Sequence, residues 1–165
     1  MNFLDLPPEL HLLIFKSLTM EDILKLRITC THFFQMFPQI THEQLLEAES
    51  TAWASEKNLY ACRYCLRLRP ACQFADRMLG RGRTRLGTDR DKRFCVECGV
   101  KPRDGPPRYG PGSQFTFQGQ ACVICILCHQ FRPAAFNSDG RGTRHCEVCW
   151  SGRIRLPAKE PPSIT

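Results

Sequence analysis

The sequence has no run of about 20 apolar residues, the length that an α-helix needs to cross a membrane. Its first segment, MNFLDLPPELHLLIF, has no Lys or Arg ahead of the apolar positions, and Asp5, Pro7, Pro8 and Glu9 interrupt those positions. We therefore expect neither a membrane anchor nor a secretion signal. The expected location is the cytosol or the nucleus, where cysteines seldom form disulfides.

The sequence also lacks the residue patterns of Ser/His/Asp and paired-carboxylate catalysis, so we expect a protein without catalytic residues of its own. A length of 165 residues suffices for one ordinary domain or for two or three small ones. The composition, 42% hydrophobic and 24% charged, is typical of a globular chain. The residue type in excess is cysteine, with eleven copies.

Charge is unevenly distributed along the chain. Residues 1–57 hold four Lys/Arg and eight Asp/Glu, whereas the rest holds nineteen Lys/Arg and eight Asp/Glu. This asymmetry predicts two modules with different roles, an acidic one followed by a basic one.

The acidic module has the periodicity of three short helices. The first carries an apolar stripe at helical spacing and has Pro7 and Pro8 in its first turn, where a missing N–H costs little. Thr19 is the expected N-cap of the second helix, and Thr41 opens a capping box with Gln44 before the third. The three stripes are Leu6, Leu10, Leu13, Ile14 and Leu18; Ile23, Leu24, Leu26 and Ile28; and Leu45, Ala48, Ala52 and Trp53.

Residues 4 to about 40 resemble the F-box. The resemblance rests on Leu-Pro-x-Glu-Leu from Leu6, Ile-Phe-x-x-Leu from Ile14 and the stretch from Asp22 to Cys30, with Phe33 where many members have Trp. It implies a three-helix unit that docks on the Skp linker subunit of an SCF-type cullin–RING ubiquitin ligase. The implied docking positions are Leu6, Pro7, Glu9, Leu10, Ile14, Leu18, Ile23 and Leu24. Cys30 lies within this unit and is expected to be a small buried apolar residue.

The basic module contains four Cys-x-x-Cys pairs. A two-residue gap lets both thiolates face one cation, and two such knuckles complete the tetrahedral shell of a structural zinc ion. We therefore predict eight ligands and two structural Zn²⁺ ions. The pairs are Cys62 and Cys65, Cys95 and Cys98, Cys125 and Cys128, and Cys146 and Cys149.

An internal repeat supports this choice of ligands. CRYCLRLRP aligns with CILCHQFRP, and KRFCVEC aligns with TRHCEVC, so that the second copy repeats both knuckles and the arginine before the third cysteine of the first. Cys72 aligns with an alanine and Cys122 has no counterpart, so neither is expected to be a ligand, although Cys122 could also pair with Cys125. His129 and His145 adjoin ligand cysteines and are expected not to bind metal themselves.

The spacing between knuckles leaves two ligand pairings open. Seventeen residues separate the knuckles of the second copy and 29 those of the first, with the excess in the Gly- and Arg-rich residues 78–92, which we expect to form a disordered loop. Duplication of a whole unit favours two separate tandem sites over a cross-braced arrangement. Arg63, Arg93 and Arg144 lie near the knuckles and are expected to offset thiolate charge.

These patterns together predict an α+β chain, with a helical F-box followed by a small β-rich tandem zinc module. The expected units are 1–57, the F-box and a linking helix; 58–104, the first zinc unit with the insertion 78–92; 105–152, a β-hairpin around Phe115 to Ile124 and the second zinc unit; and 153–165, a Pro-rich disordered tail. With the stretches CLRLRP, KRFCVECG and RYGPGSQF, the chain resembles F-box proteins of filamentous fungi that carry a Cys-rich region.

The resemblance implies a substrate receptor, whose F-box docks on the ligase while the zinc module binds an unknown protein target. The alternative is a zinc-stabilised module for nucleic acids or general protein interaction, because residues 77–108 hold ten Lys/Arg and four Asp/Glu. Against nucleic-acid binding, this stretch has few aromatic residues for base stacking. An enzymatic role is disfavoured, because four thiolates leave no open metal position for water.

Overall fold

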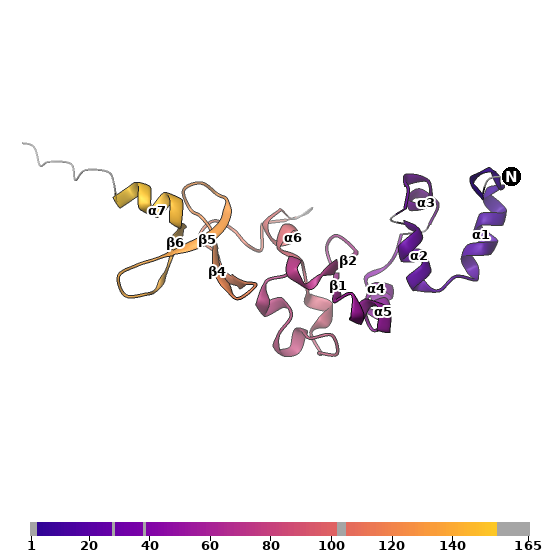
Figure 1. Cartoon of the computed structure of the whole chain (residues 1–165), viewed down its shortest axis with the longest axis horizontal. Coiled ribbons are helices and arrows are strands. Elements are labelled where there is room, and N and C mark those ends of the chain that lie inside the picture. Colours follow the sequence, from indigo (N-terminus) through magenta and orange to yellow (C-terminus); the bar gives the residue numbers. More distant parts are fainter. Residues whose placement is uncertain (1–2, 28, 38, 102–104, 155–165) are drawn as a thin grey trace, which may run out of the picture.

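The computed structural model describes residues 3–27, 29–37, 39–101 and 105–154. The molecule is elongated, with the N-terminal helices at one end, the first cysteine-rich unit in the middle and the last helix at the other end (Figure 1). Its architecture is the predicted mixture of helices and small antiparallel sheets. No helix among the described residues is long and apolar enough to cross a membrane.

The N-terminal region packs around an aromatic core. A short 3-10 turn, η1 (Phe3–Asp5), precedes α1 (Pro8–Lys16), α2 (Met20–Arg27) and α3 (Thr31–Met36). Phe15, Phe33 and Phe37 are each less than a tenth exposed, and the Phe15 and Phe37 rings lie 4.1 Å apart. The helix α3 was missed by the periodicity analysis because its six residues are too short to show a stripe. Ile28 and Pro38 lie outside the described residues.

The third predicted helix is instead two helices, α4 (His42–Glu49) and α5 (Ala52–Glu56). The capping box is confirmed: the Thr41 hydroxyl accepts from the Gln44 N–H at 3.2 Å, and the Gln44 side chain accepts from the Thr41 N–H at 2.9 Å. The break follows from a second cap, because the Thr51 hydroxyl accepts from the Ala54 N–H and starts a new helix.

The first cysteine-rich unit contains a two-stranded sheet, β1 (Leu59–Cys62) and β2 (Arg67–Pro70), and the short helix α6 (Val96–Val100). Between them the chain forms 3-10 turns, η2 (Ala71–Gln73), η3 (Asp76–Met78), η4 (Arg81–Arg83) and η5 (Arg90–Lys92). The expectation of a disordered loop over 78–92 was therefore wrong. Met78 is only 1% exposed, and the Arg85 guanidinium donates to the backbone carbonyls of Glu49 and Leu59.

The second unit is a four-stranded antiparallel sheet followed by a helix. Its strands are β3 (Gln114–Phe117), β4 (Gln120–Ile124), β5 (Phe131–Phe136) and β6 (Gly142–Cys146), in that order, and α7 (Glu147–Ile154) follows directly. The predicted hairpin is confirmed as β3 and β4, and Gly119 takes the expected turn with a φ of +76°. Of the predicted tail 153–165, residues 153 and 154 belong to α7 and the rest lies outside the described residues.

A polar contact attaches the second sheet to the first unit. The Asp76 carboxylate on η3 accepts from the backbone N–H groups of Gln118 and Gly119, at 2.8 and 2.9 Å. Beneath this contact, Phe115 and Ile124 of the hairpin belong to the same buried cluster as Phe74 of the first unit. The β3–β4 hairpin therefore extends the core of the first unit, while the second tetrad lies in a separate cluster with Val123 and Ala134.

Candidate metal centres and docking face

The structure gathers four predicted ligands of the first unit into one tetrad. The sulfur atoms of Cys62, Cys65, Cys95 and Cys98 all lie within 4.8 Å of one another. The Cys62 and Cys95 sulfurs are 3.7 Å apart. A Zn–S bond of about 2.3 Å places tetrahedral sulfurs about 3.8 Å apart, so this spacing fits a metal ion of that size.

The second tetrad has the same geometry. The sulfurs of Cys125, Cys128, Cys146 and Cys149 lie within 4.8 Å of one another, and those of Cys128 and Cys146 are 3.8 Å apart. Each tetrad combines the two knuckles of one repeat copy, which is the tandem arrangement and not the cross-braced one. These two tetrads are the groups of three or more His, Cys, Asp or Glu side chains that could hold a metal within the described residues.

Both repeat copies fold their first knuckle in the same way. Leu66 and His129, which align in the repeat, are in the left-handed region with φ of 51° and 57°. Their N–H groups donate to the carbonyls of Cys62 and Cys125, at 3.1 and 2.9 Å. This reversal turns both cysteines of the knuckle toward a common point.

The two knuckles of each copy are also joined by equivalent backbone bonds. The Arg63 N–H donates to the Arg93 carbonyl, and the Ile126 N–H donates to the Arg144 carbonyl, both at 3.1 Å. The second knuckle in each copy runs into a helix, α6 or α7. The repeat in the sequence is therefore a repeat of structure, and a backbone that is already closed around the sulfurs needs little rearrangement to receive an ion.

The first tetrad is electrostatically arranged for a cation. The pKa of the Cys62 thiol is far below its usual value, because the Cys65 and Cys95 side chains hydrogen-bond to its sulfur. The pKa of Cys98 rises to about 12, first through burial and then through negative charge at Cys62. The negative charge of one ionised thiol thus disfavours ionisation of the next. A bound dication would offset this repulsion and favour the thiolate form of all four cysteines.

In the second tetrad, too, the pKa of one thiol is lowered while that of another is raised. The pKa of Cys125 falls to about 6; burial raises it, but backbone N–H groups of Cys128, Cys146 and Leu127 outweigh burial. The pKa of Cys149 rises to about 12, first through its hydrogen bond with Cys146 and then through burial. With four sulfurs in each shell, the arrangement suits a closed structural ion and leaves no position for a reacting water.

An arginine supports the first tetrad from outside. Burial lowers the pKa of Arg69, but its hydrogen bond with Cys65 and the nearby charges of Cys65, Cys95 and Glu97 raise it overall. Its guanidinium also donates to the Glu97 carboxylate at 2.9 Å. Arg69 is part of the repeated Arg-Pro sequence, and its counterpart in the second copy, Arg132, is exposed.

The remaining cysteines lie outside both tetrads. Cys72 is exposed, Cys122 is buried within β4 opposite Phe115, and Cys30 packs partly buried against the aromatic core of α1–α3. His129 is exposed and His145 is buried, and neither belongs to a tetrad.

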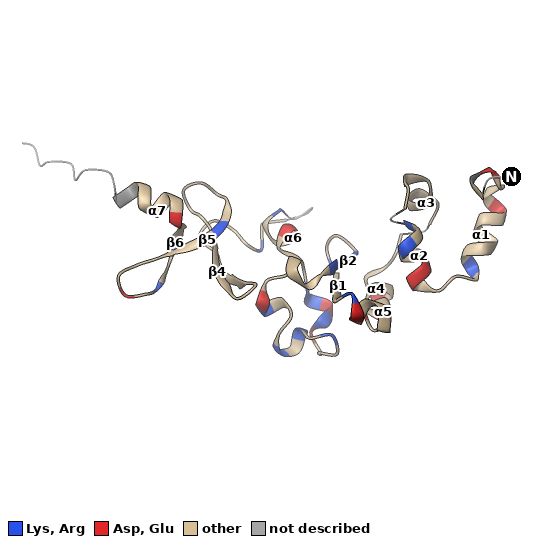
Figure 2. Ribbon diagram, viewed as in Figure 1, with Lys and Arg blue, Asp and Glu red and all other residues tan. Residues whose placement is uncertain are grey.

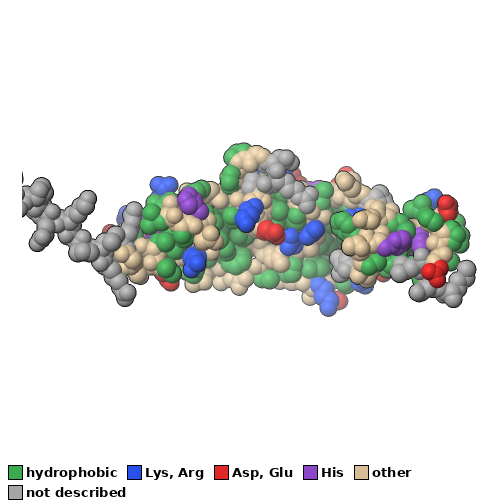
Figure 3. Space-filling model, turned by 90° about the horizontal axis from the view of Figure 1, so that it is seen from above, with side chains coloured by type: hydrophobic (Ala, Val, Ile, Leu, Met, Phe, Trp, Pro, Cys, Tyr) green, Lys and Arg blue, Asp and Glu red, His purple; other side chains and the backbone are tan. Residues whose placement is uncertain are grey.

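The implied docking positions divide into two groups. On the first helix and the residues before it, Leu10 and Ile14 are 43% and 36% exposed, Pro7 and Glu9 are exposed, and Leu6 is half-buried. The adjacent face of α1, about 100° round the helix, is buried through Phe15 and His11. Apolar side chains accordingly remain on the surface at the N-terminal end of the molecule (Figure 3).

The other three implied positions are partly used inside the protein. Leu18 packs against the aromatic core, and Leu24 packs on the cluster formed by Ile40, Leu46 and their neighbours. Ile23 contacts both clusters. The structure therefore brings Leu10 and Ile14 together on an open face but does not leave Leu18, Ile23 and Leu24 equally accessible.

A buried ion pair links the helical region to the first tetrad, and sequence reasoning missed it. The carboxylate of Glu49 on α4 accepts from Arg93 and from the Ala61 N–H, with Glu49 1% exposed and Arg93 fully buried. We expected Arg93 to offset thiolate charge. Its side chain instead pairs with the Glu49 carboxylate. The available signal was Glu49 itself, four residues after Leu45 on the same apolar stripe, where a charge requires a partner.

Comparison with known proteins gives one match. Residues 3–41 match the F-box-like family model, about a quarter of the chain, which agrees with the helical N-terminal region described above. Neither a curated protein nor a solved structure matches the chain. An F-box-like region suggests, in general, an adaptor role in an SCF-type ligase, and such adaptors are generally not catalytic.

Proposed function

We propose that the chain is a non-catalytic adaptor that docks on the Skp linker subunit of an SCF-type cullin–RING ubiquitin ligase and presents a protein target to it. The observation that carries this proposal is the open apolar face of α1 within the F-box-like region, where Leu10 and Ile14 remain exposed while Phe15 on the adjacent face is buried. An apolar helix face left open in so small a unit favours a protein partner. The full docking set is Leu6, Pro7, Glu9, Leu10, Ile14, Leu18, Ile23 and Leu24.

We further propose that each cysteine tetrad holds one structural Zn²⁺. The sulfur spacing of 3.7 to 3.8 Å and the four-thiol shells support this choice of ion. Bound zinc would neutralise part of the thiolate charge and cross-link the two knuckles of each unit. The chain supplies the closed backbone around the ion. The expected ligands are the eight cysteines of the two tetrads.

In this role the cysteine-rich units would bind the target and hold it near the transferred ubiquitin, so that the mechanism is proximity. The protein would act in the cytosol or the nucleus. The resemblance to F-box proteins of filamentous fungi with a Cys-rich region supports the same assignment.

Nucleic-acid binding is a weaker alternative, because some of the basic residues already bond to other groups of the protein. Several Lys and Arg positions are coloured along the ribbon of the first unit in Figure 2. Of these residues, Arg85 and Arg93 bond to Glu49, and Lys92 pairs with Asp89 at 2.7 Å. Fewer cations are then available to contact phosphates than the sequence indicates.

The proposed docking can be tested by substitution on α1. Leu10→Ala/Ile14→Ala is expected to abolish co-purification of the Skp linker with the full chain, because two apolar side chains in the centre of a small interface contribute most of its affinity. Leu6→Ala/Pro7→Ala should act in the same direction. Zinc content and circular dichroism establish that each variant is folded.

The matched control is Leu86→Ala, which truncates an 85%-exposed leucine in the first cysteine-rich unit. It should leave co-purification unchanged. Absence of Skp binding by the unsubstituted chain, or equal binding by the α1 variant, would contradict the adaptor proposal.

A further inference from the structure

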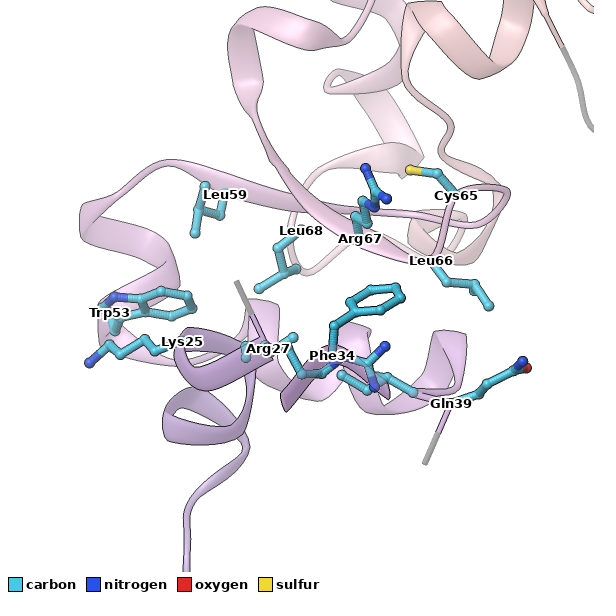
Figure 4. Close-up of a pocket in the computed structure, with 12 residues that line it drawn as sticks. Lys25, Arg27, Phe34, Gln39, Trp53, Leu59, Cys65, Leu66, Arg67 and Leu68 are labelled. Carbon is cyan, nitrogen blue, oxygen red and sulfur yellow. The ribbon is translucent and has the colours of Figure 1, made fainter. Parts of the chain in front are cut away.

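A cleft separates the F-box-like helices from the β1–β2 hairpin. It has a volume of about 650 Å³, and its walls come from α2, α3, α5 and the hairpin. Figure 4 shows the Phe34 ring rising from α3 toward the hairpin, with Leu68 and Leu66 opposite it and Trp53 at one end. The volume lies within the range of binding pockets for small ligands or for one or two side chains.

The walls of the cleft expose apolar side chains that the fold leaves uncovered. Phe34 is 50% exposed and Leu66 is 37% exposed, although both line the cleft. Contact of these apolar side chains with water is unfavourable. An occupant that spans from one wall to the other would remove both from solvent.

Three basic side chains line the cleft, and at least one of them is already paired. Lys25, Arg27 and Arg67 line it, and no carboxylate is among its described lining residues. The Lys25 ammonium lies 5.5 Å from the Trp53 ring centre and pairs on its other side with Glu21 at 2.6 Å. Arg27 stacks on Phe34 at 4.8 Å, so cation and aromatic ring lie together on one wall. Arg67, on the hairpin, is exposed.

This combination selects the chemistry of the occupant. A large apolar side chain would fill the space between Phe34 and Leu68, while a flanking carboxylate would approach the exposed Arg67 at one end. At the other end Lys25 is already paired with Glu21, so it would add a weaker attraction. The exposed apolar surface on both walls favours an extended peptide over a compact small molecule, because the peptide covers the rims as well as the interior. A basic segment would be repelled by the basic side chains of the cleft. A purely polar segment would leave the apolar walls exposed to water.

We propose that this cleft binds a short acidic peptide segment carrying a large apolar side chain, supplied by the target protein. The proposal rests on the proposed adaptor function for its biological meaning, and it names the class of target segment. The F-box-like unit forms one wall of the cleft, so a segment held there would be close to the ligase. Leu24 lines this wall and packs against the Ile40 and Leu46 cluster, so its side chain is less open to the Skp linker than those of Leu10 and Ile14. The contacts that would hold the segment belong to this chain alone and require no other subunit.

The test uses the full zinc-loaded chain without any ligase subunit. The probe is the capped peptide Asp-Asp-Leu-Phe-Asp-Asp, and Trp53 reports binding by fluorescence in a Trp150→Phe background. This peptide is expected to bind saturably, and about tenfold or more tighter than Lys-Lys-Leu-Phe-Lys-Lys or Asp-Asp-Ser-Ser-Asp-Asp. Equal binding of the acidic and basic peptides, or no saturable binding, would overturn the proposal.

Substitutions locate the binding. Arg67→Glu and Phe34→Ser are each expected to weaken binding by about tenfold or more, and Arg67→Lys should retain most of it. The matched control is Arg141→Glu, which reverses an exposed charge just before β6 in the second unit and should change nothing. Binding that is insensitive to both cleft variants would place the peptide elsewhere and refute the assignment.

The two proposals fail in different ways. Leu10→Ala/Ile14→Ala should lose the Skp linker but keep the peptide, whereas Arg67→Glu should lose the peptide but keep the Skp linker. If the peptide fails to bind while the linker still co-purifies, the cleft assignment alone is wrong.

Discussion

Native mass spectrometry of the full chain is expected to show two zinc ions per molecule, and Cys95→Ser is expected to remove one of them. Cys95 supplies one of four sulfurs to the first tetrad, and its sulfur lies 3.7 Å from that of Cys62. Structural zinc sites contribute roughly 10–16 kcal/mol of apparent binding free energy, which small units of this kind use as folding free energy. Loss of this ion should therefore unfold the unit around it.

The two tetrads are expected to differ in how far the damage spreads. The first tetrad is embedded in the largest buried cluster, which also contains Phe74, Phe94 and, from the β3–β4 hairpin, Phe115 and Ile124. The second tetrad adjoins a small cluster around Val123 and Ala134. Cys95→Ser should thus loosen both units, whereas Cys146→Ser should lose one zinc ion and leave the first unit folded.

Cys72→Ser and Cys122→Ser are the controls, because both cysteines lie outside the tetrads. Each variant should retain two zinc ions. Chelation of the unsubstituted protein should release both ions with loss of tertiary signal in near-ultraviolet circular dichroism. A single ion in the native mass, or a fully folded protein after chelation, would refute the two-site proposal.

The features that the sequence predicted are those with a local or repeated signature. Two-residue gaps between cysteines describe a knuckle that closes on itself, and the repeat indicated which knuckles belong together, as the sulfur positions of the two tetrads now show. The capping box at Thr41 and the hairpin turn at Gly119 are likewise local. Such features depend on neighbours within a few residues, so the chain order contains the information.

The features that were missed depend on distant residues. The segment 78–92 was expected to be disordered because it is rich in Gly and Arg, but Arg85 reaches carbonyls of Glu49 and Leu59 on other elements. The cleft beside Phe34 exists only because β1 and β2 lie across from α2 and α3. The basic composition of this segment predicts side chains that are solvated. The fold instead places backbone carbonyl acceptors within reach of Arg85, and these acceptors cannot be predicted from the neighbouring sequence.

The Glu49–Arg93 pair is the second interaction with a large expected effect. Glu49 accepts from Arg93, two residues before Cys95, and from the N–H of Ala61, one residue before Cys62. One carboxylate on α4 thus contacts both arms of the first tetrad, that is, the chain segment just before Cys62 and the segment just before Cys95. Arg93 also lies over the Tyr60 ring at 5.1 Å, so the pair is enclosed by packing as well as by hydrogen bonds.

Breaking this pair from one side is expected to destabilise the protein by about 3–5 kcal/mol, because an unpaired charge would remain buried. Arg93→Met and Glu49→Gln are the two single variants. Their effect is measured as the change in urea unfolding of the zinc-loaded chain, followed by Trp53 fluorescence in a Trp150→Phe background. Asp89→Asn is the matched control, because the Lys92–Asp89 pair is exposed to solvent and should contribute little to stability.

The double variant Glu49→Gln/Arg93→Met distinguishes a specific pair from two independent packing sites. Gln can still accept from the Ala61 N–H, and Met fills part of the arginine volume, so the double variant should be less destabilised than the two single effects added together. Because Glu49 joins both arms of the first tetrad, the single variants should also release one zinc ion to a chelator faster while the second ion is retained. This linkage means that zinc in the first tetrad and the position of α4 stabilise each other. Additive single effects, or equal release of both ions, would show that the pair does not couple the helical region to the metal site.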